Sequence, residues 1–251
     1  MGDDSGLLEF KSLEEMNENM EELGLRFRHG CEKEKNPISC HSLAQWLETF
    51  KHSPEQSVEI LKQNCYERKF GDSCFKYSAL KLFGRTNVAR DPLAAYQALE
   101  FGCNSCSHAK CCQGAGRVVA DGIASHAPSL TAALPLFERG CQLGLAESCF
   151  HLGGALFSLS ERAKNKASEA SKGTGPGYSL ELRNRALVAW TKGCELGHEF
   201  ACRNVSRMFS IGDGIERDQV RADEFMRKAN SLIKNPKADI LPPVKTQTLK
   251  S

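Results

Sequence analysis

The chain has 251 residues, in which 33 Lys and Arg nearly balance 31 Asp and Glu, so the formal net charge is +2. This balance argues against a dedicated surface for nucleic acid or for a charged membrane. No apolar run approaches the roughly 18 residues of a membrane span. The acidic start, Met-Gly-Asp-Asp-Ser-Gly, leads us to expect neither a secretory signal nor a typical mitochondrial presequence. Strand-like alternation is scarce, so we predict an all-α protein.

The first predicted element is an amphipathic helix over residues 7–28. It lies in an N-terminal segment, residues 1–29, that we expect to cap the repeats that follow.

Cysteine is the unusual component, with 12 in the chain. Ten of them form five pairs: Cys31 and Cys40, Cys65 and Cys74, Cys103 and Cys112, Cys141 and Cys149, and Cys194 and Cys202. The second members of successive pairs are 34, 38, 37 and 53 residues apart. With one insertion of about 16 residues removed from the last step, the period is about 34–38 residues, which is typical of stacked helix pairs.

Each pair precedes a helical stretch, and three of these stretches end at glycine, namely Gly84, Gly122 and Gly212. A second, amphipathic helix then follows in each repeat, predicted at 54–63, 92–101, 130–139, 180–192 and 219–233. The sequence therefore predicts an α-solenoid of five helix–turn–helix repeats over residues 30–233. The insertion at 159–177 is read either as a longer helix with a loop or as a mobile loop, and residues 234–251 as a disordered tail.

The position of each cysteine pair favours a disulfide over a metal site. The first cysteine ends one helix and the second begins the next, and these points lie side by side in a helical hairpin. Zinc ligands usually lie two to four residues apart in two converging pairs, a pattern absent from this series. We therefore predict five disulfides and no metal, each bridge stabilising the fold by about 2–3 kcal/mol.

The third pair is ambiguous because Cys103, Cys106, Cys111 and Cys112 are crowded together. The repeat frame favours a bond between Cys103 and Cys112. Cys106 and Cys111 can then bond to each other or remain thiols with a redox role. Zinc held by three of these cysteines and His108 is a further alternative.

Catalytic motifs are largely missing. The sequence contains no Gly-x-Ser-x-Gly, Walker loop or His-Glu-x-x-His, and its Ser-x-x-Lys matches lack the partner motifs of β-lactamases. Covalent haem attachment needs Cys-x-x-Cys-His, and here Ser107 separates Cys106 from His108. Haem bound through a His or Cys ligand remains an alternative, without a particular histidine to favour. We expect a binding protein rather than an enzyme, with thiol–disulfide activity as a lesser possibility.

The last repeat resembles a known family most clearly. Residues 212–218, Gly-Asp-Gly-Ile-Glu-Arg-Asp, followed by Ala222 and Ala229, resemble the Sel-one-like repeat signature, and residues 190–202 continue it. The chain is similar to the cysteine-rich part of that family over residues 30–233. In that part of the family the residues at each junction form a disulfide. The chain departs from the pattern in its insertion and in a first repeat without the glycine-rich loop.

Two groups of this family share the cysteine pattern. One is bacterial, secreted and described as β-lactamase-like, and it requires a signal peptide. The other is animal and mitochondrial, and residues 204–209 and 212–214 are more similar to it. That resemblance implies cytochrome c oxidase (complex IV) assembly, a location in the mitochondrial intermembrane space, and entry through the disulfide-relay import machinery. Disulfides without a signal peptide also call for an oxidising compartment reached by an unusual route.

Three functions follow from these observations. The first is a disulfide-stapled scaffold that binds protein partners during respiratory-chain assembly. The second is a haem-binding or thiol-redox protein that serves complex IV. The third is a secreted bacterial repeat protein.

Overall fold

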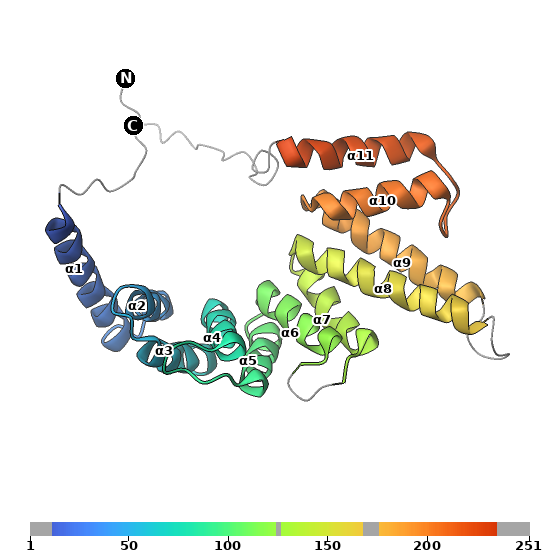
Figure 1. Cartoon of the computed structure of the whole chain (residues 1–251). Helices are drawn as coiled ribbons and strands as arrows, with labels where there is room; N and C mark the ends of the chain where they lie inside the picture. Colours follow the sequence, from blue (N-terminus) through green and yellow to red (C-terminus); the bar gives the residue numbers. More distant parts are fainter. Residues whose placement is uncertain (1–11, 124–126, 168–175, 235–251) are drawn as a thin grey trace, which may run out of the picture. The chain divides into compact units, whose positions relative to one another are not determined.

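The computed structural model describes residues 12–123, 127–167 and 176–234, and these residues form eleven α-helices without a strand (Figure 1). The helices are α1 (Leu13–Glu32), α2 (Pro37–Thr49), α3 (Pro54–Tyr66), α4 (Gly71–Phe83), α5 (Pro92–Asn104), α6 (Ala109–Asp121), α7 (Leu130–Gln142), α8 (Ala146–Ala167), α9 (Pro176–Glu195), α10 (Glu199–Ile211) and α11 (Gln219–Lys234). The predicted all-α class is confirmed. None of the described helices is long and apolar enough to cross a membrane.

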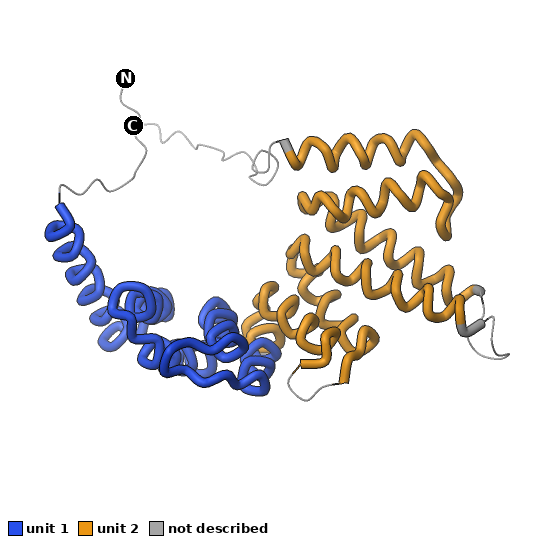
Figure 2. The backbone as a smooth tube through the Cα atoms, in the orientation of Figure 1, with its two compact units in different colours: residues 1–101 blue, residues 102–251 orange. Residues whose placement is uncertain are grey.

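The chain divides into two compact units, Met1–Phe101 and Gly102–Ser251 (Figure 2). Within unit 1, α1 packs on α2, α2 on α3, and α3 on α4. Within unit 2, the same packing of neighbours runs from α6 to α11, and α8 also touches α6 and α10. Packing that is mainly between consecutive helices is the arrangement of an α-solenoid.

Local sequence explains where the helices start. Pro54 and Pro92 are the first residues of α3 and α5, where a missing N–H has no cost, and both starts agree with the prediction. Leu130 begins α7 because the Oγ of Ser129 accepts a hydrogen bond from the N–H of Ala132 at 3.2 Å. By contrast, α9 begins at Pro176, four residues before the predicted start at 180.

Glycine ends three helices, as the sequence predicted. Gly122 and Gly212 follow α6 and α10 with φ of 74° and 72°, in the left-handed region that glycine enters without a steric penalty. Gly84, after α4, has φ of 73°.

Two expected boundaries are placed differently by the structure. Helix α1 begins at Leu13 because the Oγ of Ser12 accepts a hydrogen bond from the N–H of Glu15. It continues to Glu32, so residue 29 lies inside a helix, and residues 7–11 of the predicted helix lie outside the described residues. In the insertion, α8 continues to Ala167, which agrees with the longer-helix interpretation. Residues 168–175 and 235–251 lie outside the described part of the chain.

Both tryptophans hold a pair of helices together by the same means. Trp46 lies against Gly24 in unit 1, and Trp190 lies against Gly153 in unit 2, so closely that a Cβ on either glycine would collide with the indole ring. The indole N–H of Trp46 donates to the carbonyl of Met20 at 2.7 Å, and that of Trp190 to the carbonyl of Phe150 at 3.1 Å. Glycine therefore lets each aromatic ring pack directly on a helix backbone.

Candidate functional site

The ten cysteines of the repeat lie two by two at the helix junctions. In each pair, one cysteine is in the last turn of a helix and the other is in the first turn of the next helix. Their Cα atoms are 4.5 to 4.7 Å apart and their sulfur atoms are at bonding distance. All ten side chains are buried. The structure places within bonding distance the same cysteines that the sequence paired, including Cys103 and Cys112.

Small residues next to the cysteines let the helices approach. The residue before the first cysteine is glycine at four junctions, at Gly30, Gly102, Gly140 and Gly193. The residue before the second cysteine is Ser39, Ser73, Cys111, Ser148 or Ala201. A Cβ on Gly193 would lie 3.1 Å from that of Ala201, and one on Gly140 would collide with Ser148. Sequence reasoning missed this pairing, although an alignment of the five junctions on their cysteines displays it.

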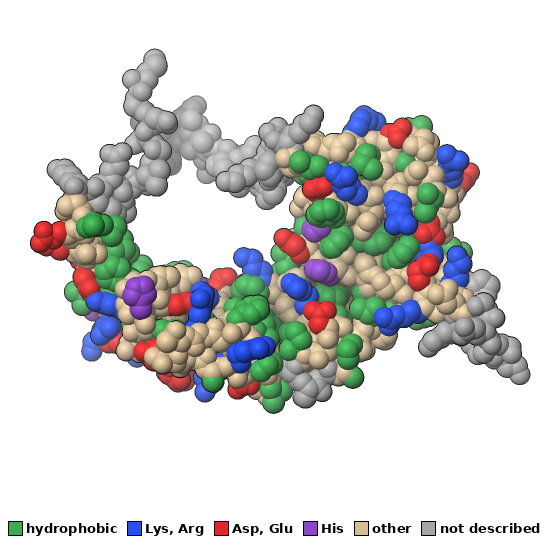
Figure 3. Space-filling view, viewed as in Figure 1, with side chains coloured by type: hydrophobic (Ala, Val, Ile, Leu, Met, Phe, Trp, Pro, Cys, Tyr) green, Lys and Arg blue, Asp and Glu red, His purple; other side chains and the backbone are tan. Residues whose placement is uncertain are grey.

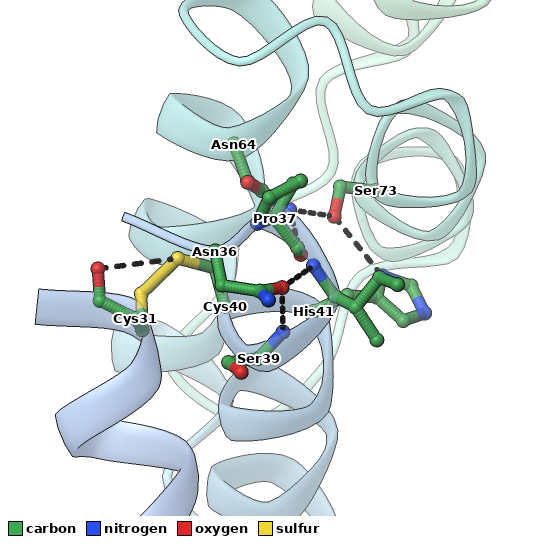
Figure 4. The surroundings of a disulfide bond; sticks show 9 residues. Cys31, Asn36, Pro37, Ser39, Cys40, His41, Asn64 and Ser73 are labelled. Carbon is green, nitrogen blue, oxygen red and sulfur yellow. Dashed lines mark hydrogen bonds between the residues drawn. A yellow bond between two sulfur atoms is a disulfide. The ribbon is translucent and has the colours of Figure 1, made fainter. Parts of the chain in front are cut away.

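The second junction replaces the glycine with a buried asparagine (Figure 4). The side-chain amide of Asn64 donates to the carbonyl of Pro37 and to the Oγ of Ser73, both at 2.8 Å. Nδ1 of His41, on α2, lies 3.0 Å from the same Oγ. Burial lowers the pKa of His41, which favours its neutral form. At this junction, side-chain hydrogen bonds hold the helices together, whereas at Gly30, Gly140 and Gly193 the helices are in close contact.

The third junction holds the two cysteines outside the five pairs. Cys111 is fully buried, and its Sγ lies 3.2 Å from Nδ1 of His108, the residue that precedes α6. It occupies the same place in the repeat as Ser39, Ser73 and Ser148. The simplest explanation for Cys111 is therefore that the junction needs a small residue there. Cys106 is half-buried in the turn between α5 and α6.

A row of aromatic rings connects α7, α8 and the beginning of α10 in unit 2. Phe137 stacks on His151 with ring centroids 5.5 Å apart, and Phe150 stacks on His198 at 4.4 Å. Phe200, 59% exposed, is the last ring of this row, and its centroid lies 6.4 Å from that of Phe150. Burial lowers the pKa of both His151 and His198. Neutral imidazoles are therefore favoured here, where they stack as aromatic rings.

The described residues do not form the zinc site that the sequence offered as an alternative. Across the described residues, no three His, Cys, Asp or Glu side chains are grouped to hold a metal ion, and His108 has no such set around it. One cavity of about 380 Å³ lies between α7, α8 and α9, over Leu152, Leu156 and Val188. A second, of about 220 Å³, lies between α8 and α10, over Trp190. Neither of these linings includes a histidine, whereas two cavities in unit 1, of about 410 and 440 Å³, are lined in part by His52 and by His29.

Comparisons with known proteins give the same fold and a consistent set of relatives. No protein-family model matches the chain. Cytochrome c oxidase assembly factor 7 of Xenopus tropicalis is 30% identical over 91% of this chain and 93% of its own length. The protein of that name from Danio rerio is also 30% identical, over 91% of this chain and 94% of its own length. A Sel1 repeat protein from Oxalobacter formigenes superposes with a TM-score of 0.62 at 15% identity, covering 90% of this chain and 93% of that chain, and shows the fold.

Proposed function

Because this chain belongs to the cytochrome c oxidase assembly factor 7 family, we propose that it takes part in assembling cytochrome c oxidase, complex IV, as a scaffold that binds protein partners. The observation that carries the proposal is similarity over nearly the full length of both chains, which leaves no large region unmatched. These relatives give no support to the secreted bacterial alternative.

A binding role agrees with the architecture. Within each unit, consecutive helix pairs present exposed side chains that are available to bind a partner. In the described residues, small-residue contacts, stacked aromatic rings and cysteine pairs hold neighbouring helices together. The proposed role of the scaffold is to bind its partners.

The proposal includes five disulfides and a compartment that permits them. All ten paired cysteines are buried at bonding distance, so oxidation requires no rearrangement of the helices. Such bridges persist in oxidising compartments. The mitochondrial intermembrane space, entered through the disulfide-relay machinery, meets that requirement for an assembly factor of complex IV.

The test of function is genetic rescue. Cells without the protein should lose assembled complex IV on native gels, together with oxidase activity, and the wild-type chain should restore both. Normal oxidase assembly in the null cells would overturn the proposal. Fractionation with protease protection should place the rescuing chain between the two mitochondrial membranes, and a matrix location would overturn that part.

The pairing has its own test, namely peptide mapping under non-reducing conditions after the free thiols have been trapped in denaturant. We expect the five pairs given above, with the trap on Cys106 and Cys111. Peptides that join Cys103 to Cys106 would contradict the third assignment.

A second candidate, thiol redox activity serving complex IV, is favoured by the 3.2 Å contact between His108 and Cys111, since an imidazole can promote a thiolate. The full burial of Cys111 weighs against direct attack on a substrate. Loss of rescue with Cys106→Ser or Cys111→Ser, while helicity and stability are unchanged, would favour this function over the scaffold.

A further inference from the structure

The cavity between α8 and α10 has an apolar floor of side chains held firmly in place. Trp190 and Met208 are 5% and 2% exposed, and the indole N–H of Trp190 already donates to the carbonyl of Phe150. Trp190 therefore presents the surface of its ring to the cavity, and its N–H is not available as a hydrogen-bond donor. Ile211 stands at the mouth and is 57% exposed. The volume, about 220 Å³, is below the ~300–1,000 Å³ of pockets that take whole small molecules, and suits one anchor side chain.

The charges around the cavity are unequal. Asp213 lines it, but this carboxylate is already paired with the guanidinium of Arg183, which also pairs with Glu161. Arg207, exposed on α10, lines the same cavity, and no carboxylate among the described residues lies within ion-pair distance of it. Arg203, one turn earlier, is occupied by Glu199. Of the two charged side chains in the lining, Arg207 is therefore the one without an ion-pair partner among the described residues, and a guanidinium is the group best suited to bind a carboxylate.

A helical glycine keeps the cavity open. Gly154, in α8, lines the wall, and a Cβ built on it would meet nothing within 4 Å. Its neighbour Gly153 is needed for the packing of Trp190, whereas Gly154 has no such packing role. Glycine in mid-helix costs about 1 kcal/mol relative to alanine, and here that cost leaves an opening.

The row of aromatic rings continues the same surface toward the beginnings of α8 and α10. Phe150 lies one helical turn before Gly154, and Phe200 lies two turns before Arg207. In Figure 3, histidine, hydrophobic and some Asp or Glu surface lie together over the N-terminal ends of these helices, and Lys and Arg surface lies over α10. The cavity and the aromatic rings therefore lie along the same faces of α8 and α10, on which an extended segment can bind.

We infer that this cavity is the anchor pocket for a partner protein, occupied by one large apolar side chain of an extended segment whose neighbouring Asp or Glu pairs with Arg207. Charge complementarity at the cavity selects the acidic neighbour, because the carboxylate of Asp213 is already bound to Arg183, whereas the guanidinium of Arg207 has no carboxylate partner among the described residues. This inference rests on the proposed binding function and specifies the chemistry of the partner.

The experiment is selection of random peptides displayed on phage, using the oxidised full-length protein as bait. Peptides enriched on the wild type should share an apolar residue next to Asp or Glu. Gly154→Leu, which fills the opening, should reduce their binding at least tenfold. Gly177→Leu is the matched control, because it adds the same side chain at an exposed helical glycine with nothing within 4 Å.

Charge reversal gives the sharper outcome. On Arg207→Glu, the selected peptides should carry Lys or Arg in place of the acid, while Arg227→Glu, on the exposed surface of α11, should leave the consensus unchanged. A consensus that ignores Arg207→Glu, binding that survives Gly154→Leu, or no enrichment over background would each overturn the inference.

Rescue of complex IV separates this inference from the proposed function. If null cells lose the oxidase but Gly154→Leu and Arg207→Glu both restore it fully, the pocket is wrong and the assembly role stands. If null cells assemble the oxidase normally while the peptide consensus follows the charge at 207, the assembly role is wrong and the pocket stands.

Discussion

Unit 1 and unit 2 place different side chains beside equivalent cysteine pairs. At the second junction, in unit 1, Asn64 and His41 both reach Ser73, and hydrogen bonds tie three helices together. At the last junction, in unit 2, Gly193 meets Ala201 directly, and the neighbouring contact is the stack of Phe150 on His198. The cysteine pair and its small neighbours fix how two helices meet. The other side chains determine whether hydrogen bonds or stacked aromatic rings connect the neighbouring helices.

The largest expected effect tests what the two units share. Full reduction should lower the melting temperature by many degrees, because several bridges of about 2–3 kcal/mol each would be lost. Replacing one pair by alanine, either Cys65 with Cys74 or Cys194 with Cys202, should lower the free energy of unfolding by about 2–3 kcal/mol in each unit. Urea denaturation measures both, and unchanged stability after reduction would contradict the bracing role.

The next effect should separate the units. Asn64→Ala leaves the buried Ser73 hydroxyl and the Pro37 carbonyl without their amide donor, and should lower the free energy of unfolding by about 2 kcal/mol. Asn204→Ala, in the lining of the cavity between α8 and α10 of unit 2, is the matched control and should change the free energy of unfolding by less than about 0.5 kcal/mol. Equal losses in the two variants would show that the hydrogen-bonded junction is not special.

Acid should weaken unit 2 more than unit 1. Burial lowers the pKa of His151 and His198 in unit 2, and of His41 in unit 1, below the ordinary value of about 6.5. Between the lowered and ordinary values, the unfolded chain binds more protons, so this contribution is complete above about pH 6.5 and is lost as the pH falls through that window. The double variant His151→Gln, His198→Gln should lose less stability between pH 7 and pH 5 than the wild type, and His41→Gln should show a smaller change. Denaturation curves that fall equally in all three proteins would contradict this assignment.

The smallest effect is expected at Cys111. Serine occupies the same place in three other junctions, so Cys111→Ser should change the free energy of unfolding by less than about 0.5 kcal/mol. Cys111→Leu should destabilise by about 1–3 kcal/mol through overpacking at a fully buried site. A large loss with serine would show that the sulfur itself matters and would bring the third junction back toward redox chemistry.

The sequence allowed the fold to be predicted, as well as which cysteines lie close together, because both depend on regular spacing. Prolines at 54 and 92 also placed two helix starts correctly, since proline acts locally. The ends of those helices were placed too early, because the cysteine at each end was treated as a boundary when it lies inside the last turn. The cavity over Trp190 was beyond prediction, since it forms where side chains from three helices meet. The stack of Phe150 on His198 likewise joins residues of different repeats.

The shortness of the cysteine loops has a consequence for how the chain acquires its covalent form. Each pair spans only 8 or 9 residues of sequence separation. A chain that enters an oxidising space end first can therefore close each bridge before the next pair arrives, without waiting for a distant partner. Competition between thiols is then confined to residues 103–112, where four cysteines lie together. Oxidative folding should be fast at four junctions. At the third junction it should be slower, because alternative disulfide isomers can form among the four cysteines.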